Sequence, residues 1–577
     1  MPRTRVSSRH WARRVLVALL GCGLLAAGCT QTAAVTARIS QPPRPGGTLY
    51  VLVEGDDFPH IDPQRTYYTP AMNVLRLFTR TLTTYRAAPG DRGSELVPDL
   101  ATDLGRPSDG NTVWQFTLKP NLKWEDGSDL TCQDVKYGVE RSFSDLIDGG
   151  ASAYPRSYLA GGAGYRGPYS GGNNNGNGLA SIKCLDLRTI QFQLVRPAGD
   201  FSYVVALPVF APVPAKRDTK DRYDLHPASS GPYQILSYGK PQGAKQRELV
   251  FGRNRHWDRR TDPVRRQYPD KIVVRFGQNA DQMTHHMISD EGDYRYAVAL
   301  DTKVPPRFVQ QVINDPQLSA RTVTGTTSGV RYMAINTRTV PVKACRQALV
   351  YAFDKRAFRT ALGGSPYGDY ATTILPPTMK AHRDFDVYDS NNQPDGDLAR
   401  ARLLMSGASC PTRLTLDYMD SPEYAQASDV IVDSYQRLGI KVVKHPIAKD
   451  RFLDVVTVPA EQHDLVLTGW VPDFPNGSGT IPALFDGRTI REHVGGNQNF
   501  SLINDKEINK LIDEANGESD LNRQYQLWGQ LDRRIQEQAL VVPILYDRSL
   551  QMLGSKVRGS YLHPAFLGVD LCTLGVA

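Results

Sequence analysis

Hydrophobic and polar positions recur along the chain with two different periods, one typical of strands and one of helices. Trp114, Phe116 and Leu118 are separated by polar residues, which predicts a half-buried strand. From about residue 330 to 520, segments with helical spacing are followed by short apolar runs, which predicts an α/β unit. The helices expected along the chain span 71–81, 133–143, 281–289, 399–405, 425–438 and 521–538, and the strands include 47–53, 190–194, 271–276, 414–416, 441–443 and 541–546.

Residues 464–476 join a buried strand to a candidate binding loop. Leu465–Leu467 is a short apolar run, after which the chain breaks at Gly469 and presents Trp470, and then Asp473 between two prolines. Prolines fix the backbone before a ligand arrives, so less ordering entropy is lost on binding. The same residues also fit a strand-to-loop turn with a core tryptophan and a solvated aspartate.

Three other segments carry strong local signals. Residues 149–178 are rich in Gly and Asn and lack the Lys-Ser/Thr of a P-loop, which predicts a flexible surface loop. Residues 207–214 contain three prolines and predict a strand at the edge of a sheet. Thr131 is a suitable N-cap for helix 133–143, with Asp134 three residues later.

Length and composition limit the class of protein. A chain of 577 residues is too long for one core and should form two to four domains. Apolar content of 40% and charged content of 22% are typical of a soluble globular protein. The formal charge is +8, but residues 1–28 hold five arginines and no acid, which leaves +3 (8 − 5) for the remainder. That excess is too small to indicate a nucleic-acid partner.

The N-terminus reads as an export signal. Arginines up to Arg14 precede a short apolar stretch that ends in small residues before Cys29, so residues 1–28 are expected to be a signal peptide. The sequence from Leu25 to Cys29 resembles a bacterial lipobox, in which the cysteine carries lipid; plain secretion is the alternative. Residues 29–46 are expected to be a flexible tether. No later stretch approaches the roughly 20 apolar residues of a spanning helix.

Residues that could carry out catalysis are not arranged in any motif of known spacing. The chain contains no G-x-S-x-G and no HExxH, and His285-His286 with Glu291 is the nearest approach to a ligand cluster. Adjacent histidines on a helix point in different directions, so these are interpreted as a solvated or partly packed helix face. No enzymatic activity, metal or cofactor is expected.

Several motifs together resemble one protein family. The segment Leu130–Arg141 reads LTCQDVKYGVER, which is similar to the LT-x-x-DV-x-Y-x-x-ER signature of the family 5 solute-binding proteins. Further matches follow in family order as far as Asn476: Ser230–Tyr233 (SGPY), Arg253–Trp257 (RNRHW), Asp281–Asp293, Tyr332–Thr337 with Cys345–Lys355, and residues 464–476. These proteins are the extracytoplasmic binding components of peptide, oligosaccharide and nickel ABC importers.

The resemblance implies an α/β, two-lobed periplasmic-binding-protein-like fold. The first lobe would contain an extra small domain, and a two-strand hinge would join the lobes and allow them to close on a solute. The expected parts are 47–85, 195–325 and 541–577 for the main domain of lobe 1, 86–194 for its accessory domain, and 326–540 for lobe 2.

The same layout suggests how the cysteines pair. Cys22 leaves with the signal peptide and Cys29 is the lipid site, so five cysteines remain in a compartment that permits disulfides. Two bridges can be formed from five cysteines in fifteen ways. The expected layout favours Cys132–Cys184 and Cys345–Cys410, leaving Cys572 free.

The resemblance also implies a site and a function. In peptide-binding members, the aspartate of a W-x-x-D motif pairs with the peptide's α-ammonium group, and Trp470 and Asp473 occupy those positions. Tyr546 is a weaker candidate to line the cleft, with a core role as its alternative. The expected function is capture of short peptides for an ABC permease by a monomeric lipoprotein on the outer face of the cytoplasmic membrane. An oligosaccharide or other solute, and a secreted hydrolase, are the alternatives.

Overall fold

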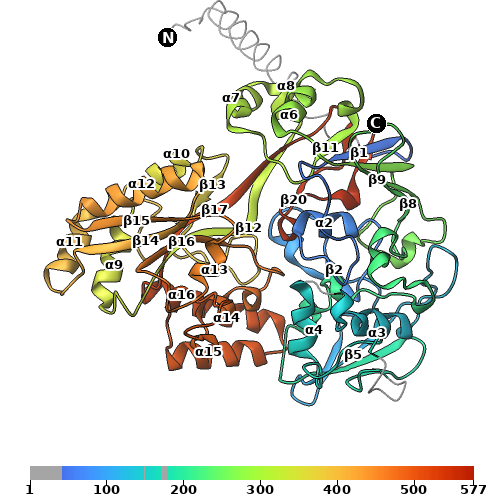
Figure 1. The fold of residues 1–577 in the computed structure, drawn as a ribbon, viewed down its shortest axis with the longest axis horizontal. Helices are drawn as coiled ribbons and strands as arrows, with labels where there is room; N and C mark the ends of the chain where they lie inside the picture. Colours follow the sequence, from blue (N-terminus) through green and yellow to red (C-terminus); the bar gives the residue numbers. More distant parts are fainter. Residues whose placement is uncertain (1–41, 148–149, 171–177) are drawn as a thin grey trace, which may run out of the picture.

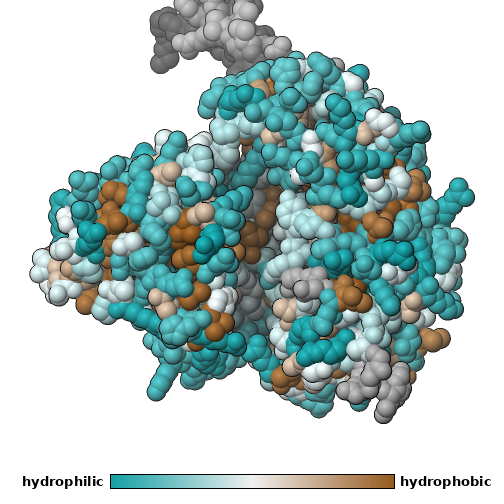
Figure 2. Space-filling view, in the orientation of Figure 1, coloured by the Kyte–Doolittle hydropathy of each residue, from teal (hydrophilic) through white to brown (hydrophobic). Residues whose placement is uncertain are grey.

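Two lobes connected by long strands make up the protein. The computed structural model describes residues 42–147, 150–170 and 178–577. Lobe 1 carries the N- and C-terminal parts of the chain, and lobe 2 carries most of the second half (Figure 1). The space-filling view shows the surface hollowed between the lobes, with hydrophobic residues visible in the hollow (Figure 2).

A five-stranded sheet forms the centre of lobe 1, in the order β11-β1-β10-β9-β8. Strand β1 runs parallel to both of its neighbours, and its apolar residues Leu49 and Val51 are fully buried. The strands are β1 (Thr48–Leu52), β8 (Tyr233–Gly239), β9 (Glu248–Arg253), β10 (Lys271–Arg275) and β11 (Ala297–Ala299), and the helices around them include α2 (Thr69–Leu75), α6 (Ala280–Ser289) and α7 (Pro306–Asn314).

An accessory domain of lobe 1 is built on a four-stranded sheet in the order β4-β5-β7-β6. The predicted alternation is confirmed, because Trp114 and Phe116 of β5 are buried and the residues between them are not. Thr131 and Asp134 form a complete capping box at the start of α3. The elements are β4 (Arg106–Ser108), β5 (Val113–Thr117), α3 (Cys132–Arg141), α4 (Ala153–Tyr158), β6 (Ile182–Cys184) and β7 (Thr189–Gln193).

Lobe 2 is a six-stranded sheet with helices on both faces. The strand order is β13-β17-β12-β16-β14-β15, and the last three strands run parallel to one another. One face packs on α9 (Lys343–Ala352), α10 (Lys355–Ala361), α11 (Leu398–Ser406) and α12 (Pro422–Gln436). The other face packs on α13 (Phe452–Val456), α14 (Ile481–Phe485), α15 (Lys506–Gly517) and α16 (Leu521–Glu537). The remaining strands are β13 (Gly368–Tyr370), β14 (Arg413–Met419), β15 (Lys441–Ile447) and β16 (Leu465–Trp470).

Two long antiparallel strands connect the lobes. Strands β12 (Thr322–Ile335) and β17 (Val541–Met552) pair along their length, with an irregularity in the register between Thr326 and Val330. The first half of β12 packs with lobe 1 and its second half with lobe 2. A paired double strand with a local break in its ladder is suited to act as a hinge.

Some domain limits differ from those expected. Residues 541–546 lie in the sheet and core of lobe 2, so the return to lobe 1 comes several residues after the predicted position 541. The core of the accessory domain also includes Leu82 and residues 198–213, beyond the predicted range 86–194.

The predicted edge strand at 207–214 is wrong. The segment contains a short 3₁₀ helix, Pro208–Phe210, and it is buried rather than at an edge, since Val209, Phe210 and Val213 are fully inaccessible. Prolines lack the N–H needed for a strand ladder. The backbone N–H of Val213 instead donates to the carbonyl oxygen of Asp134 in α3.

The Gly-rich segment 149–178 is only in part the loop that was expected. Residues 149 and 171–177 lie outside the described residues, but the segment also contains helix α4, whose Tyr154 contacts Asp473 of lobe 2. Short elements among glycines give little periodic signal, because four to six residues span less than two helical turns.

Both predicted disulfide bridges are present. Cys132 pairs with Cys184, and Cys345 pairs with Cys410, while Cys572 is free and buried. The first bridge joins α3 to β6, and the second joins α9 to the chain after α11. Each therefore connects neighbouring elements within one lobe.

The predicted signal peptide, Cys29 and most of the tether fall outside the described residues. Within the described ranges, no helix has the length and apolar character needed to cross a membrane.

Candidate ligand-binding site

The loop that follows β16 lies where the two lobes meet. Leu465–Leu467 is buried in lobe 2, and Trp470 at the end of the strand pairs with Val330 of the connecting strand β12. The loop then presents Asp473 and Phe474 toward lobe 1. The sequence-predicted stretch is therefore a strand end at the lobe interface, and not a turn on a free surface.

Two tyrosine hydroxyls from lobe 1 hold the Asp473 carboxylate. Tyr67 donates to Oδ1 at 2.6 Å, and Tyr154 of α4 donates to Oδ2. Burial raises the pKa of both tyrosines, and the Asp473 charge raises it further, so both hydroxyls stay protonated donors. The carboxylate thus links lobe 2 to both parts of lobe 1.

Asp473 has no cationic partner in the described part of the chain. Its only side-chain partners there are the two tyrosine hydroxyls. A carboxylate has about four acceptor positions, so two hydroxyls leave capacity for further donors. A half-buried carboxylate without a compensating charge is suited to bind a cationic group of a ligand.

Phe474 fixes the loop to lobe 1 by hydrophobic packing. The side chain is 2% exposed and belongs to the core of the accessory domain, although it comes from lobe 2. Its ring stacks on Tyr203 at 5.9 Å and meets Tyr154 edge-on at 6.1 Å. Contact between the lobes therefore buries an aromatic side chain that separating them would expose.

Trp470 supports the loop and keeps part of its surface accessible. Its indole N–H donates to the carbonyl oxygen of Gly479 at 3.0 Å, which ties the strand end to the far side of the loop. The ring is half-buried and packs against the helical core of lobe 2.

Tyr546 of β17 is 5% exposed. Its hydroxyl is bonded to Thr373 Oγ1 at 2.8 Å and accepts the backbone N–H of Thr373. Burial raises its pKa to about 12. The structure therefore places Tyr546 in the core of lobe 2, which was the alternative to a place in the cleft wall.

Further contacts close the interface around the loop. Ser478 donates to the buried carboxylate of Asp200, and the hydroxyls of Tyr203 and Tyr525 lie 2.6 Å apart. At Gly199 the backbone of lobe 1 contacts the backbone of lobe 2 directly. The Gly199 N–H donates to the carbonyl oxygen of Asn516 at 2.8 Å. A Cβ on Gly199 would lie 1.7 Å from the carbonyl oxygen of Glu518, so only glycine permits this approach.

Comparison with known proteins assigns the family. Residues 95–491 match bacterial extracellular solute-binding proteins, family 5 Middle. The chain belongs to this family. The Escherichia coli dipeptide-binding protein is 22% identical over 499 residues, covering 82% of this chain and 84% of the relative. These comparisons bear out the family resemblance of the sequence motifs.

Solved structures give the same result for the fold. The clavulanic acid biosynthesis oligopeptide binding protein 2 is 32% identical with a TM-score of 0.83, covering 92% of this chain and 96% of that one. The unliganded open form of the murein tripeptide-binding protein MppA has a TM-score of 0.75 at 20% identity, covering 93% and 98%. The two-lobed α/β fold is therefore confirmed.

Sequence reasoning missed the lobe 1 half of the candidate site. Tyr67 and Tyr154 contact Asp473 from 406 and 319 residues away along the chain, and neither lies in a motif. The histidine pair of α6 is a helix face as interpreted, with His285 exposed and His286 lying 3.4 Å from Glu291.

Proposed function

We propose that this solute-binding protein captures short peptides between its lobes and delivers them to an ABC permease. The observation that carries the proposal is the Asp473 carboxylate, which lies at the lobe interface with no cationic partner among the described residues. The names of its relatives, a dipeptide-binding protein and an oligopeptide-binding protein, support a peptide ligand.

Asp473 is proposed to accept the α-ammonium group of the peptide. The ammonium offers three donors, and Tyr67 and Tyr154 would keep the carboxylate oriented while it binds. Trp470 would supply a flat apolar wall that tolerates varied side chains. Closure is favoured only by contacts that the ligand makes in the closed state, so pairing at this interface couples recognition to hinge motion.

Export and anchoring complete the proposal. Residues 1–28 would direct secretion, and lipid on Cys29 would hold the protein at the outer face of the cytoplasmic membrane, close to the permease. Residues 29–46 would then serve as the tether. The protein is proposed to act as a monomer without cofactor and to catalyse no reaction.

Calorimetry with the tag-free mature protein tests the ammonium pairing. Wild type should bind short peptides and lose affinity when the peptide is N-acetylated. Asp473→Asn should weaken free peptides by roughly 2–5 kcal/mol, or about 30-fold to several thousand-fold, and bring them level with acetylated ones. Asp454→Asn, at a carboxylate 72% exposed in lobe 2, is the control and should bind like wild type.

The same titrations separate the alternatives. Equal binding of free and acetylated peptides by both proteins would exclude the pairing at Asp473. Binding of oligosaccharides but not peptides would replace the ligand class, and product formation would indicate a hydrolase. Mass spectrometry of co-purified ligand gives an independent identification.

A further inference from the structure

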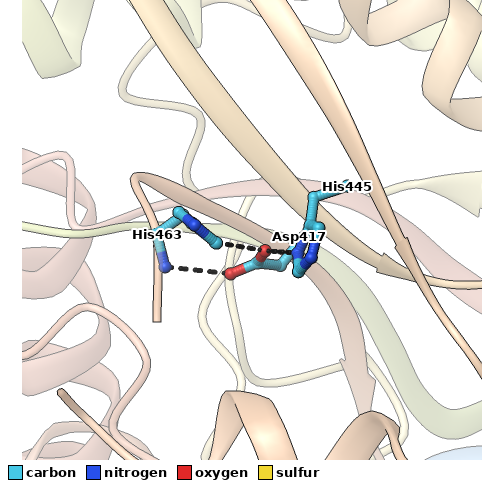
Figure 3. Close-up of side chains that lie close together, drawn as sticks. All are labelled: Asp417, His445 and His463. Atoms are coloured by element: carbon cyan, nitrogen blue, oxygen red, sulfur yellow. Dashed lines mark hydrogen bonds and ion pairs between the residues drawn. The ribbon is translucent and has the colours of Figure 1, made fainter. Parts of the chain in front are cut away.

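Three side chains at the edge of the lobe 2 sheet converge on one point. Asp417 lies on β14, His445 is its neighbour in register on the parallel strand β15, and His463 lies just before β16. The Nδ1 atoms of His445 and His463 are each 2.7 Å from the same oxygen, Oδ1 of Asp417 (Figure 3). The backbone N–H of His463 donates to the other oxygen at 2.9 Å.

The carboxylate of this group is buried without a permanent positive charge beside it. Asp417 is 0% exposed, and no lysine or arginine pairs with it within the described ranges. Removing a carboxylate from water is costly unless a cation or a set of hydrogen bonds compensates it. The two imidazoles are each 44% exposed, so solvent reaches the histidine side of the group while the carboxylate stays buried.

We propose that Asp417, His445 and His463 form a binding site for a divalent transition-metal ion of the zinc type. The three donor atoms lie within 4.8 Å of one another. Two imidazole nitrogens and one carboxylate oxygen are a common zinc ligand set, with water in a fourth position. The ion would bind the lone pair of each Nδ1, so each neutral imidazole would carry its single proton on Nε2 and not between Nδ1 and Oδ1.

Only a small movement is needed to admit the ion. Zinc bonds of about 2.0–2.2 Å in a tetrahedral site place ligand atoms roughly 3.3 Å apart. Each Nδ1 now lies 2.7 Å from Oδ1 and must move outward, and the two histidine ligand atoms, which lie within 4.8 Å of each other, must reach the same spacing. Rotation of the two partly exposed imidazoles can provide this difference, while Asp417 stays fixed by the His463 N–H. The site is thus largely formed before the metal arrives.

The His286–Glu291 pair of α6 shows what an unorganised pair looks like. His286 Nδ1 lies 3.4 Å from Glu291 Oε2, and both side chains are substantially exposed. Within the part of the chain that the structure describes, no buried carboxylate accepts from both His285 and His286. The Asp417 group differs in that a buried carboxylate receives two imidazoles from separate strands.

The proposed metal would brace the sheet edge. It would link β14, β15 and the start of β16, which is the end of that strand opposite Trp470. A metal bound here should therefore stabilise lobe 2 without changing peptide affinity. This separates the metal site from the proposed peptide site.

Zinc titration of the tag-free mature protein by calorimetry tests the proposal. Wild type should bind about one equivalent, and zinc should raise its melting temperature. His445→Ala and His463→Ala should each weaken zinc by at least about 100-fold, since each removes one of three protein ligands. The control His285→Ala/His286→Ala removes two histidines from another surface and should bind zinc like wild type.

Two measurements make the outcome independent of any variant's folding. Co²⁺ bound to wild type should show the visible absorption of a tetrahedral site, and anomalous diffraction from zinc-soaked crystals should locate the ion at Asp417. Wild-type affinity weaker than about 100 µM, or unchanged affinity in both single variants, would overturn the proposal and leave a hydrogen-bonded triad only.

Discussion

Removing the tyrosine hydroxyls that hold Asp473 should weaken closure of the lobes. Tyr154→Phe deletes one hydrogen bond between the lobes and keeps the ring, which still packs against Phe474. Tyr67→Phe does the same at the other carboxylate oxygen. Neither change alters the charge of Asp473 or the fold of either lobe.

The magnitude follows from the type of hydrogen bond. A hydrogen bond to a charged group contributes about 1.5–3 kcal/mol, and the half-buried position of Asp473 favours the lower end. A loss of about 1.5 kcal/mol shifts the ratio of closed to open forms about tenfold. Because the closed form is the one that encloses ligand, peptide affinity should fall by a similar factor. The double variant should lose less than the sum, since both hydroxyls serve one carboxylate.

Calorimetry with a short peptide, combined with small-angle scattering of the free protein, measures both quantities. Each variant should bind about tenfold more weakly and show a larger radius of gyration without ligand. Tyr169→Phe is the matched control, because its hydroxyl donates to Asp218 within lobe 1. Unchanged affinity and size in Tyr154→Phe and Tyr67→Phe would refute the role given to these hydroxyls.

Three predictions concern stability and can be checked by scanning calorimetry or urea unfolding. Replacing Cys345 and Cys410 by alanine opens a 65-residue loop and should cost about 4 kcal/mol, with reductant then having less effect than on wild type. Arg141→Met leaves the buried Asp62 without its bidentate partner and should cost about 3–5 kcal/mol, whereas a loss below 1 kcal/mol would contradict the argument. Burial raises the pKa of Asp532 to about 6, so the native state keeps a proton that the unfolded chain loses near pH 4. This stabilisation is complete below pH 4 and falls by about 3 kcal/mol as the pH rises through 6, relative to Asp532→Asn, which does not titrate.

Local patterns were sufficient where one element decided the structure. The helix that starts at Thr131 and the strand at Leu465–Leu467 were predicted because capping, alternation and burial act over a few neighbouring residues. The family motifs and their order along the chain then supplied the two-lobed layout.

Contacts between distant segments that no family motif marks could not be predicted from the sequence. Tyr154 lies in a Gly-rich segment that has no hydrophobic periodicity. His445 and His463 follow Asp417 by 28 and 46 residues, which is not a known metal-binding spacing. Their proximity depends on strand order and register, which the hydrophobic pattern does not encode. Residues 207–214 show the opposite case: their prolines predicted an edge strand, but the segment is buried and begins with a 3₁₀ turn at Pro208–Phe210.

The contact at Gly199 gives the closing motion a mechanical end-stop. Because backbone contacts backbone there, the closest approach of the two lobes at this point does not depend on side-chain rotamers. A bound molecule too large for the enclosed space would hold this contact apart. The Gly199 amide should therefore be protected from hydrogen exchange when the bound ligand lets the lobes form this contact. It should exchange faster when a larger ligand keeps the lobes apart.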